Sequence, residues 1–477
     1  MNTYDIYVGG TFKKTDEVLQ VVNPYTGLVF AETYLGGEKD LEAAIVKALS
    51  VENVMRELSS FQRYKILCHI SKEITRKKDH LSSVLAQEAG KPLVYAAAEI
   101  DRSAQTFLIA AEESKRLPRE YISLDWSPAG INREGIVKYF PIGLVAGISP
   151  FNFPMNLASH KIAPAMAAGC PIILKPASAT PLSTLELAKI VDETPLPKGA
   201  LSIIPMSRST GEKLVTDERF KLLTFTGSPE VGWQMKKQAG KKKVVLELGG
   251  NAGVIVTGSA DIDFAVKRCL IGGFAYSGQV CIHAQRLFVE KPVFDEFTEK
   301  FVEGAKNLKW GDPLDPKTQI SVMIDEPNAK RVGTWVREAV DGGARLLCGG
   351  NKNGPFFEPT VLSHTEASMK VNCLEIFGPV VTLEPYKDFQ EAVRSVNDTP
   401  FGLQAGVFTN RLDEINMAFD RLDVGGVIIN DVPTFRVDHM PYGGIKDSGL
   451  GREGVKYAIY DMMEPKILVQ PSSYNSA

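Results

Sequence analysis

A cysteine after a glycine-containing bend is the first residue in this sequence with the chemistry of a catalytic group. Cys281 ends the segment 278–281 (GQVC), in which Gly278 leaves room for a ligand to approach the sulfur. As a thiolate, such a cysteine is a strong nucleophile toward a carbonyl carbon. A plain buried cysteine is the competing interpretation, and it is the one that we assign to the other five: Cys68, Cys170, Cys269, Cys348 and Cys373.

A glutamate in an apolar segment is the second candidate. Glu247 lies within residues 245–250 (VLELGG), where a carboxylate is costly to bury unless it is paired or used. Burial would raise its pKa toward a value that suits a general base. A salt-bridged glutamate at the end of a strand explains the same pattern equally well.

An asparagine between two prolines is the third. Asn152 is the centre of residues 150–154 (PFNFP), a loop that follows a predicted strand. In an open α/β sheet, ligands bind beyond the carboxyl ends of the strands, and an amide there can donate to a developing oxyanion. The alternative is a turn in which Asn152 caps the following helix.

The elements that must position these residues form an α/β pattern. Residues 40–117 are helical in pattern, and from residue 143 short β-rich runs alternate with helices. Alternation of this kind predicts a parallel sheet with right-handed crossovers, and a second α/β region is expected over 250–446. The β-rich runs are 143–148, 171–174, 201–204, 222–225 and 244–246.

Two helices of this first region have recognisable ends. Residues 155–169 are helical in composition and close at Gly169, which suits a C-cap. Residues 181–193 form an amphipathic helix, with Thr180 as its expected N-cap and Pro181 in its first turn. The final apolar run, 467–469, is expected to be an edge strand used in assembly.

The bulk properties exclude several classes of protein. The 477 residues exceed one ordinary core, and a net charge of -3 gives no support to a nucleic-acid partner. The six cysteines form no C-x-x-C pair, so no metal site or disulfide framework is expected and a reducing compartment fits. The sequence has no signal peptide and no apolar run as long as a membrane span, which favours a cytoplasmic protein without a membrane partner.

One apparent dinucleotide motif fails the test of its context. Residues 449–454 (GLGREG) match G-x-G-x-x-G, but they neither follow a β-run nor open a β-α-β unit. We interpret them as tight backbone near the C-terminal assembly segment.

Taken together, the three candidate segments resemble those of the aldehyde dehydrogenase superfamily. Further motifs of that family follow in the same order and with compatible spacing, over nearly the whole chain: 175–178 (KPAS), 225–228 (FTGS), 375–379 (EIFGP) and 441–444 (PYGG). The resemblance is to its hydrolytic, NAD(P)-dependent branch, which includes lactaldehyde, non-phosphorylating glyceraldehyde-3-phosphate and phosphonoacetaldehyde dehydrogenases.

The resemblance implies the fold and the assembly. A Rossmann-like cofactor-binding domain is expected over 1–122 and 142–249, and an α/β catalytic domain over 250–446. A small β oligomerisation segment is expected over 123–141 and 457–477, which implies a homodimer or homotetramer whose terminal strands around 467–469 pair across subunits.

The resemblance also implies roles for individual residues. Cys281 would attack the aldehyde to form a thiohemiacetal, Asn152 and the backbone N–H of Cys281 would form the oxyanion hole, and Glu247 would activate water for thioester hydrolysis. Glu375 and Phe377 would hold the nicotinamide end of NAD or NADP. The remaining expected cofactor-binding residues are Ile148, Phe151, Lys175, Ser178, Gly211 and Ser228.

Position 178 bears on the choice of cofactor. Many NAD-selective relatives have a glutamate there, whose charge would repel the 2′-phosphate of NADP, whereas Ser178 is able to donate to it. The sequence therefore predicts that NADP is used at least as well as NAD.

Four residues indicate the substrate. Arg102, His160, Arg436 and His439 are candidates for lining the aldehyde site, in a branch that acts on small hydroxylated or anionic aldehydes. A helix-surface histidine at position 160 and a surface ion pair at position 102 are equally good interpretations of those two residues.

Two other functions remain open from the sequence. A CoA-acylating aldehyde dehydrogenase would pass the thioester to CoA, but that branch generally lacks the hydrolytic base that Glu247 would provide. A structural or binding protein with the same fold should have lost Cys281, Glu247 or Asn152, and all three are present.

Overall fold

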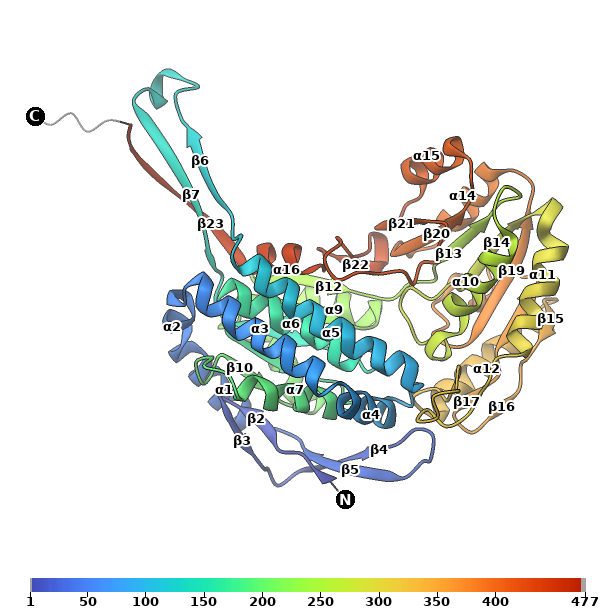
Figure 1. The fold of residues 1–477 in the computed structure, drawn as a ribbon, viewed down its shortest axis with the longest axis horizontal. Coiled ribbons are helices and arrows are strands. Elements are labelled where there is room, and N and C mark those ends of the chain that lie inside the picture. Colours follow the sequence, from blue (N-terminus) through green and yellow to red (C-terminus); the bar gives the residue numbers. More distant parts are fainter. Residues whose placement is uncertain (1, 473–477) are drawn as a thin grey trace, which may run out of the picture.

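The structure, a computed structural model, describes residues 2–472, and two large sheets with a projecting arm dominate it (Figure 1). The first sheet has eight strands in the order β22-β12-β11-β8-β9-β10-β2-β3. Its five central strands, β12 to β10, run parallel, which confirms the predicted parallel α/β sheet. Its strands are β2 (Ile6–Val8), β3 (Thr11–Lys13), β8 (Val145–Ile148), β9 (Ile172–Lys175), β10 (Leu201–Ile203), β11 (Leu222–Thr226), β12 (Lys243–Glu247) and β22 (Gly449–Leu450).

Both faces of this sheet are covered by helices. Ile172 and Leu174 of β9 pack into one apolar cluster with α3 to α7, whereas Ile173 between them faces the other cluster with α1 and α8. The alternation follows from the two-residue period of a strand. The helices are α1 (Glu38–Ser50), α2 (Glu52–Glu57), α3 (Ser60–Arg76), α4 (Lys78–Ala89), α5 (Leu93–Ser114), α6 (Pro154–Ala168), α7 (Leu182–Asp192), α8 (Arg208–Thr216) and α9 (Pro229–Gln238).

The ends of α6 and α7 test two expectations. Helix α6 ends at Gly169, which has the left-handed φ of 89° that favours glycine. The expected N-cap of α7, Thr180, is wrong, because Pro181 occupies that position. The carboxylate of Glu88 accepts the N–H groups of Leu182 and Ser183 at 2.6 and 3.0 Å, so a distant side chain caps α7.

The second α/β region contains a seven-stranded sheet in the order β15-β18-β19-β14-β13-β20-β21. All of its neighbouring strands run parallel except β15 and β18. The strands are β13 (Gly253–Val256), β14 (Arg286–Glu290), β15 (Arg345–Cys348), β18 (Thr360–Ser363), β19 (Val380–Tyr386), β20 (Gln404–Phe408) and β21 (Gly426–Ile429). The helices are α10 (Ile262–Phe274), α11 (Lys291–Lys306), α12 (Glu326–Asp341), α13 (Lys370–Cys373), α14 (Phe389–Asn397) and α15 (Leu412–Arg421).

The arm is a three-stranded antiparallel sheet, β6 (Arg119–Ser123), β7 (Arg133–Pro141) and β23 (Met463–Pro471), that projects from the body (Figure 1). Strand β23 pairs with β7 over its whole length, and its other edge is unpaired within residues 2–472. Ile467, Leu468 and Val469 on this strand are 44–56% exposed. The predicted edge strand at 467–469 is therefore confirmed.

Smaller elements complete the fold. Helix α16 (Val455–Asp461) precedes β23, and β22 pairs antiparallel with β12, so the 449–454 motif lies outside any β-α-β unit, as expected. The remaining strands are β1 (Asn2–Thr3), β4 (Val18–Val22), β5 (Val29–Tyr34), β16 (Lys352–Asn353) and β17 (Phe356–Phe357). Within residues 2–472, no helix combines the length and apolar character that a membrane span needs.

Candidate active site

The three candidate catalytic residues line one cavity of about 360 Å³. Asn152 lies in the loop after β8, Glu247 is the last residue of β12, and Cys281 follows the short helical turn η2 (Ala275–Gly278). Two of the three thus lie at the carboxyl ends of parallel strands, where open sheets bind ligands. The cavity is also lined by Pro150, Phe151, Leu157, Thr226, Gly227, Ser228, Leu248, Gly249, Asn328, Arg331, Glu375 and Phe377.

A tight, left-handed backbone segment presents Cys281. Tyr276 and Ser277 have φ of 48° and 53°, conformations that non-glycine residues rarely adopt, and Gly278 follows with φ of 68°. A Cβ on Gly278 would lie 2.1 Å from the carbonyl oxygen of Gly378, so only glycine fits. Burial raises the pKa of the Cys281 thiol to about 11, and a contact of 3.1 Å from Sγ to the Tyr442 hydroxyl opposes that rise.

The amide of Asn152 faces the cysteine segment. Its Nδ2 donates to the backbone oxygen of Gln279 at 2.9 Å, which leaves the second N–H of the amide for another acceptor. The backbone N–H of Cys281 donates no hydrogen bond to another residue of the range 2–472. The alternative role of Asn152 as a helix cap is wrong, because Phe153 is the N-cap residue of α6.

A buried ion pair supports the Asn152 loop. Lys91 is fully buried, pairs with Glu99, and donates to the backbone oxygen of Asn152 at 2.6 Å. The other carboxylate oxygen of Glu99 accepts the N–H groups of Met155 and Asn156 at the start of α6.

Lys91 also contacts the segment that carries the nucleophile. Its ammonium group lies 3.8 Å from the ring centroid of Phe153 and 4.3 Å from that of Tyr276, distances at which a cation is attracted to an aromatic face. One lysine therefore contacts both the Asn152 loop and the backbone that leads to Cys281. Neither Lys91 nor Glu99 was among the residues predicted from the sequence.

The carboxylate of Glu247 is buried and has no hydrogen-bond partner within residues 2–472. Neither of its carboxylate oxygens has a hydrogen-bond partner among the described residues, and no described residue forms an ion pair with it. Burial, and next the charge of Glu453, raise its pKa well above the usual value of a glutamate. The alternative of a salt-bridged strand end is therefore wrong.

Glu375 and Phe377 are brought to the same cavity. Glu375 accepts the N–H of Gly250 at 3.0 Å, and a Cβ on Gly249 would lie 2.0 Å from its other oxygen, which explains the glycine at position 249. Burial raises the pKa of Glu375 to about 7. The ring of Phe377 meets Phe151 edge-on, with centroids 5.9 Å apart.

A second pocket, of about 630 Å³, gathers four of the predicted cofactor-binding residues. Ile148, Lys175, Ser178 and Gly211 all line it. Within the described residues, Lys175 forms no ion pair and its ammonium donates no hydrogen bond. Its side chain passes over Gly211, where a Cβ would lie 2.9 Å from Cδ of Lys175. Arg208, the first residue of α8, also lines the pocket, although it was not among the predicted cofactor-binding residues.

Ser228 is the N-cap residue of α9 and lines the catalytic cavity rather than this second pocket. Its side chain caps no backbone group, so the first N–H groups of α9 remain free to meet an anion. The predicted cofactor-binding residues are therefore divided between two pockets, and residues of the first sheet and its connections line both of them.

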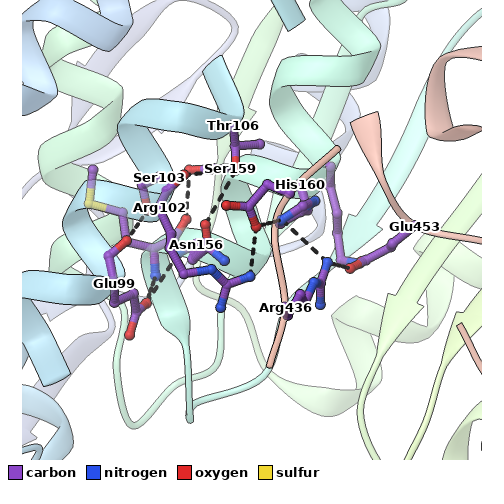
Figure 2. Close-up of polar contacts among 12 residues, drawn as sticks. Glu99, Arg102, Ser103, Thr106, Asn156, Ser159, His160, Arg436 and Glu453 are labelled. Carbon is purple, nitrogen blue, oxygen red and sulfur yellow. Dashed lines mark hydrogen bonds and ion pairs between the residues drawn. The ribbon is translucent and has the colours of Figure 1, made fainter. Parts of the chain in front are cut away.

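Three of the four predicted substrate residues form one buried cluster (Figure 2). Asp438 accepts from Arg102 at 2.6 Å and lies 2.8 Å from Nε2 of His160. Arg436 lies 3.3 Å from the same nitrogen and pairs with Glu453 at 2.9 Å. The surface interpretation of His160 is wrong, because its side chain is fully buried.

Lys161 adds a third basic side chain to the cluster. Lys161 donates to Thr226 at 2.7 Å and lies 3.4 Å from Glu453, so it joins Arg102 and Arg436 opposite Asp438 and Glu453. Burial, followed by the charge of Arg436, lowers the pKa of His160, which favours its neutral form. The neighbouring cations lower the pKa of Glu453 to about 2 against the effect of burial.

The four substrate candidates do not line the 360 Å³ cavity itself. Arg436 approaches it indirectly, because its guanidinium lies 3.7 Å from the ring centroid of Tyr442, whose hydroxyl contacts Cys281. His439 is exposed on the same segment as Arg436. Among residues 2–472, no group of three or more His, Cys, Asp and Glu side chains is arranged to hold a metal ion.

Comparison with known proteins places this geometry in context. A model described as "Aldehyde dehydrogenase family" matches residues 12–468. The 3-sulfolactaldehyde dehydrogenase of Priestia aryabhattai is 40% identical over 467 residues, which cover 98% of each chain.

Two solved structures share the whole fold. Aldehyde dehydrogenase 21 from Physcomitrella patens, in complex with the reaction product succinate, has a TM-score of 0.98 and 46% identity over 99% of each chain. The glyceraldehyde-3-phosphate dehydrogenase GapN from Methanocaldococcus jannaschii, complexed with NADP, has a TM-score of 0.90 and 38% identity over 95% of this chain and 99% of its own.

Proposed function

We infer that this chain, which belongs to the aldehyde dehydrogenase family, oxidises a small hydroxylated or anionic aldehyde to its carboxylic acid with NADP or NAD. The observation that carries the hydrolytic route is the carboxylate of Glu247, which has no partner among residues 2–472 and lies in the same cavity as Cys281 and Asn152. A base of this kind activates water, which favours an acid as the product over a CoA thioester and an enzyme over a structural protein.

Each of the three residues has one role in the proposed reaction. The thiolate of Cys281 attacks the aldehyde carbon to give a thiohemiacetal, whose oxyanion is stabilised by Asn152 Nδ2 and the backbone N–H of Cys281. Bound NAD(P) supplies the acceptor for the hydride. Glu247 then takes a proton from the water that hydrolyses the Cys281 thioester, and the acid leaves with the thiol restored.

The residues of the second pocket fit the adenosine end of a dinucleotide. Lys175 has no partner there among the described residues, Ser178 adds a hydroxyl, and the missing side chain at Gly211 makes room for the side chain of Lys175. Ser228 and the free N–H groups of α9 suit the diphosphate, while Glu375 and Phe377 suit the nicotinamide end.

The buried cluster supports an anionic substrate. Three basic side chains, Arg102, Arg436 and Lys161, lie with the carboxylates of Asp438 and Glu453 in the region behind Tyr442. Arg102 is the member with the most access, since 29% of its side chain is exposed. The relatives named for 3-sulfolactaldehyde and glyceraldehyde 3-phosphate act on aldehydes of this kind.

A panel of aldehydes tests this assignment. We expect 3-sulfolactaldehyde, glyceraldehyde 3-phosphate, phosphonoacetaldehyde and succinic semialdehyde to include a substrate with a kcat/KM about 10- to 100-fold above that of propanal, because one charge-assisted hydrogen bond contributes about 1.5–3 kcal/mol. Lactaldehyde is the hydroxylated, uncharged comparison. Equal efficiencies for charged aldehydes and propanal would refute the role of the cluster, and a CoA requirement would refute the hydrolytic route.

The cofactor preference is tested at position 178. We expect the unmodified enzyme to use NADP at least as well as NAD, and Ser178→Glu to weaken NADP binding by about 10- to 100-fold, because a carboxylate beside the 2′-phosphate costs on the order of 1–3 kcal/mol. The measurement is kcat/KM for each cofactor at constant aldehyde. A strong preference of the unmodified enzyme for NAD would show that Ser178 does not control the choice and that other residues of the pocket, within 207–211, set it.

The domain boundaries and the assembly are also part of the proposal. We assign cofactor binding to 1–122 and 142–249, catalysis to 250–446 and oligomerisation to 123–141 and 457–477. The edge of β23 is unpaired among residues 2–472 and carries the exposed apolar residues 467–469, which supports a homodimer or homotetramer, because an open edge strand is a liability that pairing with another subunit removes.

A further inference from the structure

The hydroxyl of Tyr442 is in hydrogen-bond contact with the sulfur of Cys281. Cys281 packs against an apolar cluster of Val280, Ile282, Leu403 and Tyr442, and among the described residues the Tyr442 hydroxyl is the one hydrogen-bond partner of its sulfur, at 3.1 Å. A negative charge that develops on the sulfur therefore has one side-chain hydrogen-bond donor within reach among the described residues.

The position of Tyr442 is fixed from both sides. Its backbone N–H and C=O pair with those of Glu453 at 2.9 and 2.6 Å. The guanidinium of Arg436 lies 3.7 Å from the centroid of its ring, and Arg436 is itself paired with Glu453. Since a cation over an aromatic ring withdraws electron density, this contact makes the hydroxyl a better donor.

The protonation states suit donation from tyrosine to sulfur. Burial raises the pKa of Tyr442 well above its usual value, so its hydroxyl keeps its proton. Burial also raises the pKa of the Cys281 thiol, to about 11, while the hydrogen bond from Tyr442 lowers it. A hydrogen bond to a charged group contributes about 1.5–3 kcal/mol, more than one to a neutral thiol.

We propose that Tyr442 is a further catalytic residue, whose hydroxyl donates a hydrogen bond to the Cys281 thiolate and stabilises it before attack. The thiol proton leaves to water, and Tyr442 keeps its own proton. The sulfur then gives its electron pair to the aldehyde carbon as the carbonyl pair moves to oxygen, so the sulfur loses its charge and the hydrogen bond weakens. This proposal rests on the proposed role of Cys281 as the nucleophile.

Tyr442→Phe, which removes only the hydroxyl, tests the proposal. The rate of Cys281 alkylation by iodoacetamide, followed by mass spectrometry of its peptide across a pH series, reports the thiolate. We expect the midpoint of this profile to rise by about one to two pH units, as about 1.5–3 kcal/mol of lost stabilisation requires. Alkylation needs neither aldehyde nor cofactor. Its result therefore tests the role of Tyr442 separately from the proposed substrate and overall reaction.

A matched control and a kinetic measurement complete the test. Tyr386→Phe removes another buried hydroxyl, which donates to the backbone of Val256 in the second sheet, and it should leave the midpoint unchanged. In Tyr442→Phe the pre-steady-state rate of acylation should fall about three- to tenfold, since the higher nucleophilicity of a more basic thiolate offsets part of the loss. Hydrolysis of the thioester should keep its rate.

A fluorinated tyrosine at position 442 decides the question if Tyr442→Phe does not fold. It keeps the shape and the hydroxyl but is a stronger donor, so the alkylation midpoint should move to lower pH. A midpoint that is unchanged in the variants that fold would overturn the proposal, as would an equal rise in Tyr386→Phe.

Discussion

Replacing Cys281 by alanine is expected to abolish both dehydrogenase and esterase activity, by a factor on the order of 10⁴ or more, while cofactor binding remains. No other cysteine lines the cavity that also holds Asn152 and Glu247. The loss should therefore be in kcat and in the pre-steady-state formation of reduced cofactor. Both are measured by absorbance, and fluorescence titration reports the binding of the reduced cofactor.

Cys373→Ala is the matched control for this substitution. Cys373 is half-buried like Cys281, but it ends α13, and its Sγ donates to the backbone oxygen of Ser368 at 3.4 Å. This variant should retain full activity. Substantial turnover by Cys281→Ala, or a comparable loss in Cys373→Ala, would contradict the assignment of the nucleophile.

Glu247→Gln should separate the two halves of the reaction. We expect one equivalent of reduced cofactor per site to form in a burst, and steady turnover to fall about 10²- to 10⁴-fold, because the amide is unable to take the proton of the attacking water. Stopped-flow absorbance measures both phases, and the thioester should accumulate as a mass increase on Cys281. If the burst and the turnover disappear together, Glu247 acts before hydrolysis.

The pH dependence gives the same assignment an independent check. A general base works only when ionised, and the pKa of Glu247 is raised, so turnover limited by hydrolysis should fall as pH drops through that raised pKa rather than near the usual pKa of a glutamate. Glu384→Gln is the control, because burial also raises the pKa of Glu384, which instead accepts a hydrogen bond from Thr365 and does not line the catalytic cavity. It should leave the burst and the profile unchanged.

The sequence motifs predicted much of the site because the chemistry constrains short segments. Gly278 and Gly249 could be recognised as special from sequence, and the structure gives the reason, since a side chain at either position would collide with Gly378 or Glu375. The order of strands and helices likewise follows from local patterns. Lys175 and Gly211 then meet because Lys175 ends β9 and Gly211 lies in α8, the helix that follows the neighbouring strand β10.

Other parts of the site depend on distant packing that no local pattern records. Lys91 occurs in a glycine- and proline-containing turn, which is typical of exposed residues, yet it is buried between the rings of Phe153 and Tyr276. Asp438 joins Arg102 to His160 across three separate segments. The cap of α7 failed as a prediction for the same reason, since Glu88 is 94 residues away.

The ion pair of Lys91 and Glu99 constrains how this sequence is able to evolve. Removing one member of a fully buried pair leaves a charge without a partner, which costs about 3–5 kcal/mol, whereas replacing both by apolar residues of similar volume costs much less. The second route would also release the Asn152 loop and the start of α6. Only simultaneous substitutions of Lys91 and Glu99 that keep a hydrogen-bond donor for the backbone oxygen of Asn152 should therefore be tolerated. The two positions should covary or stay unchanged among active descendants of this enzyme.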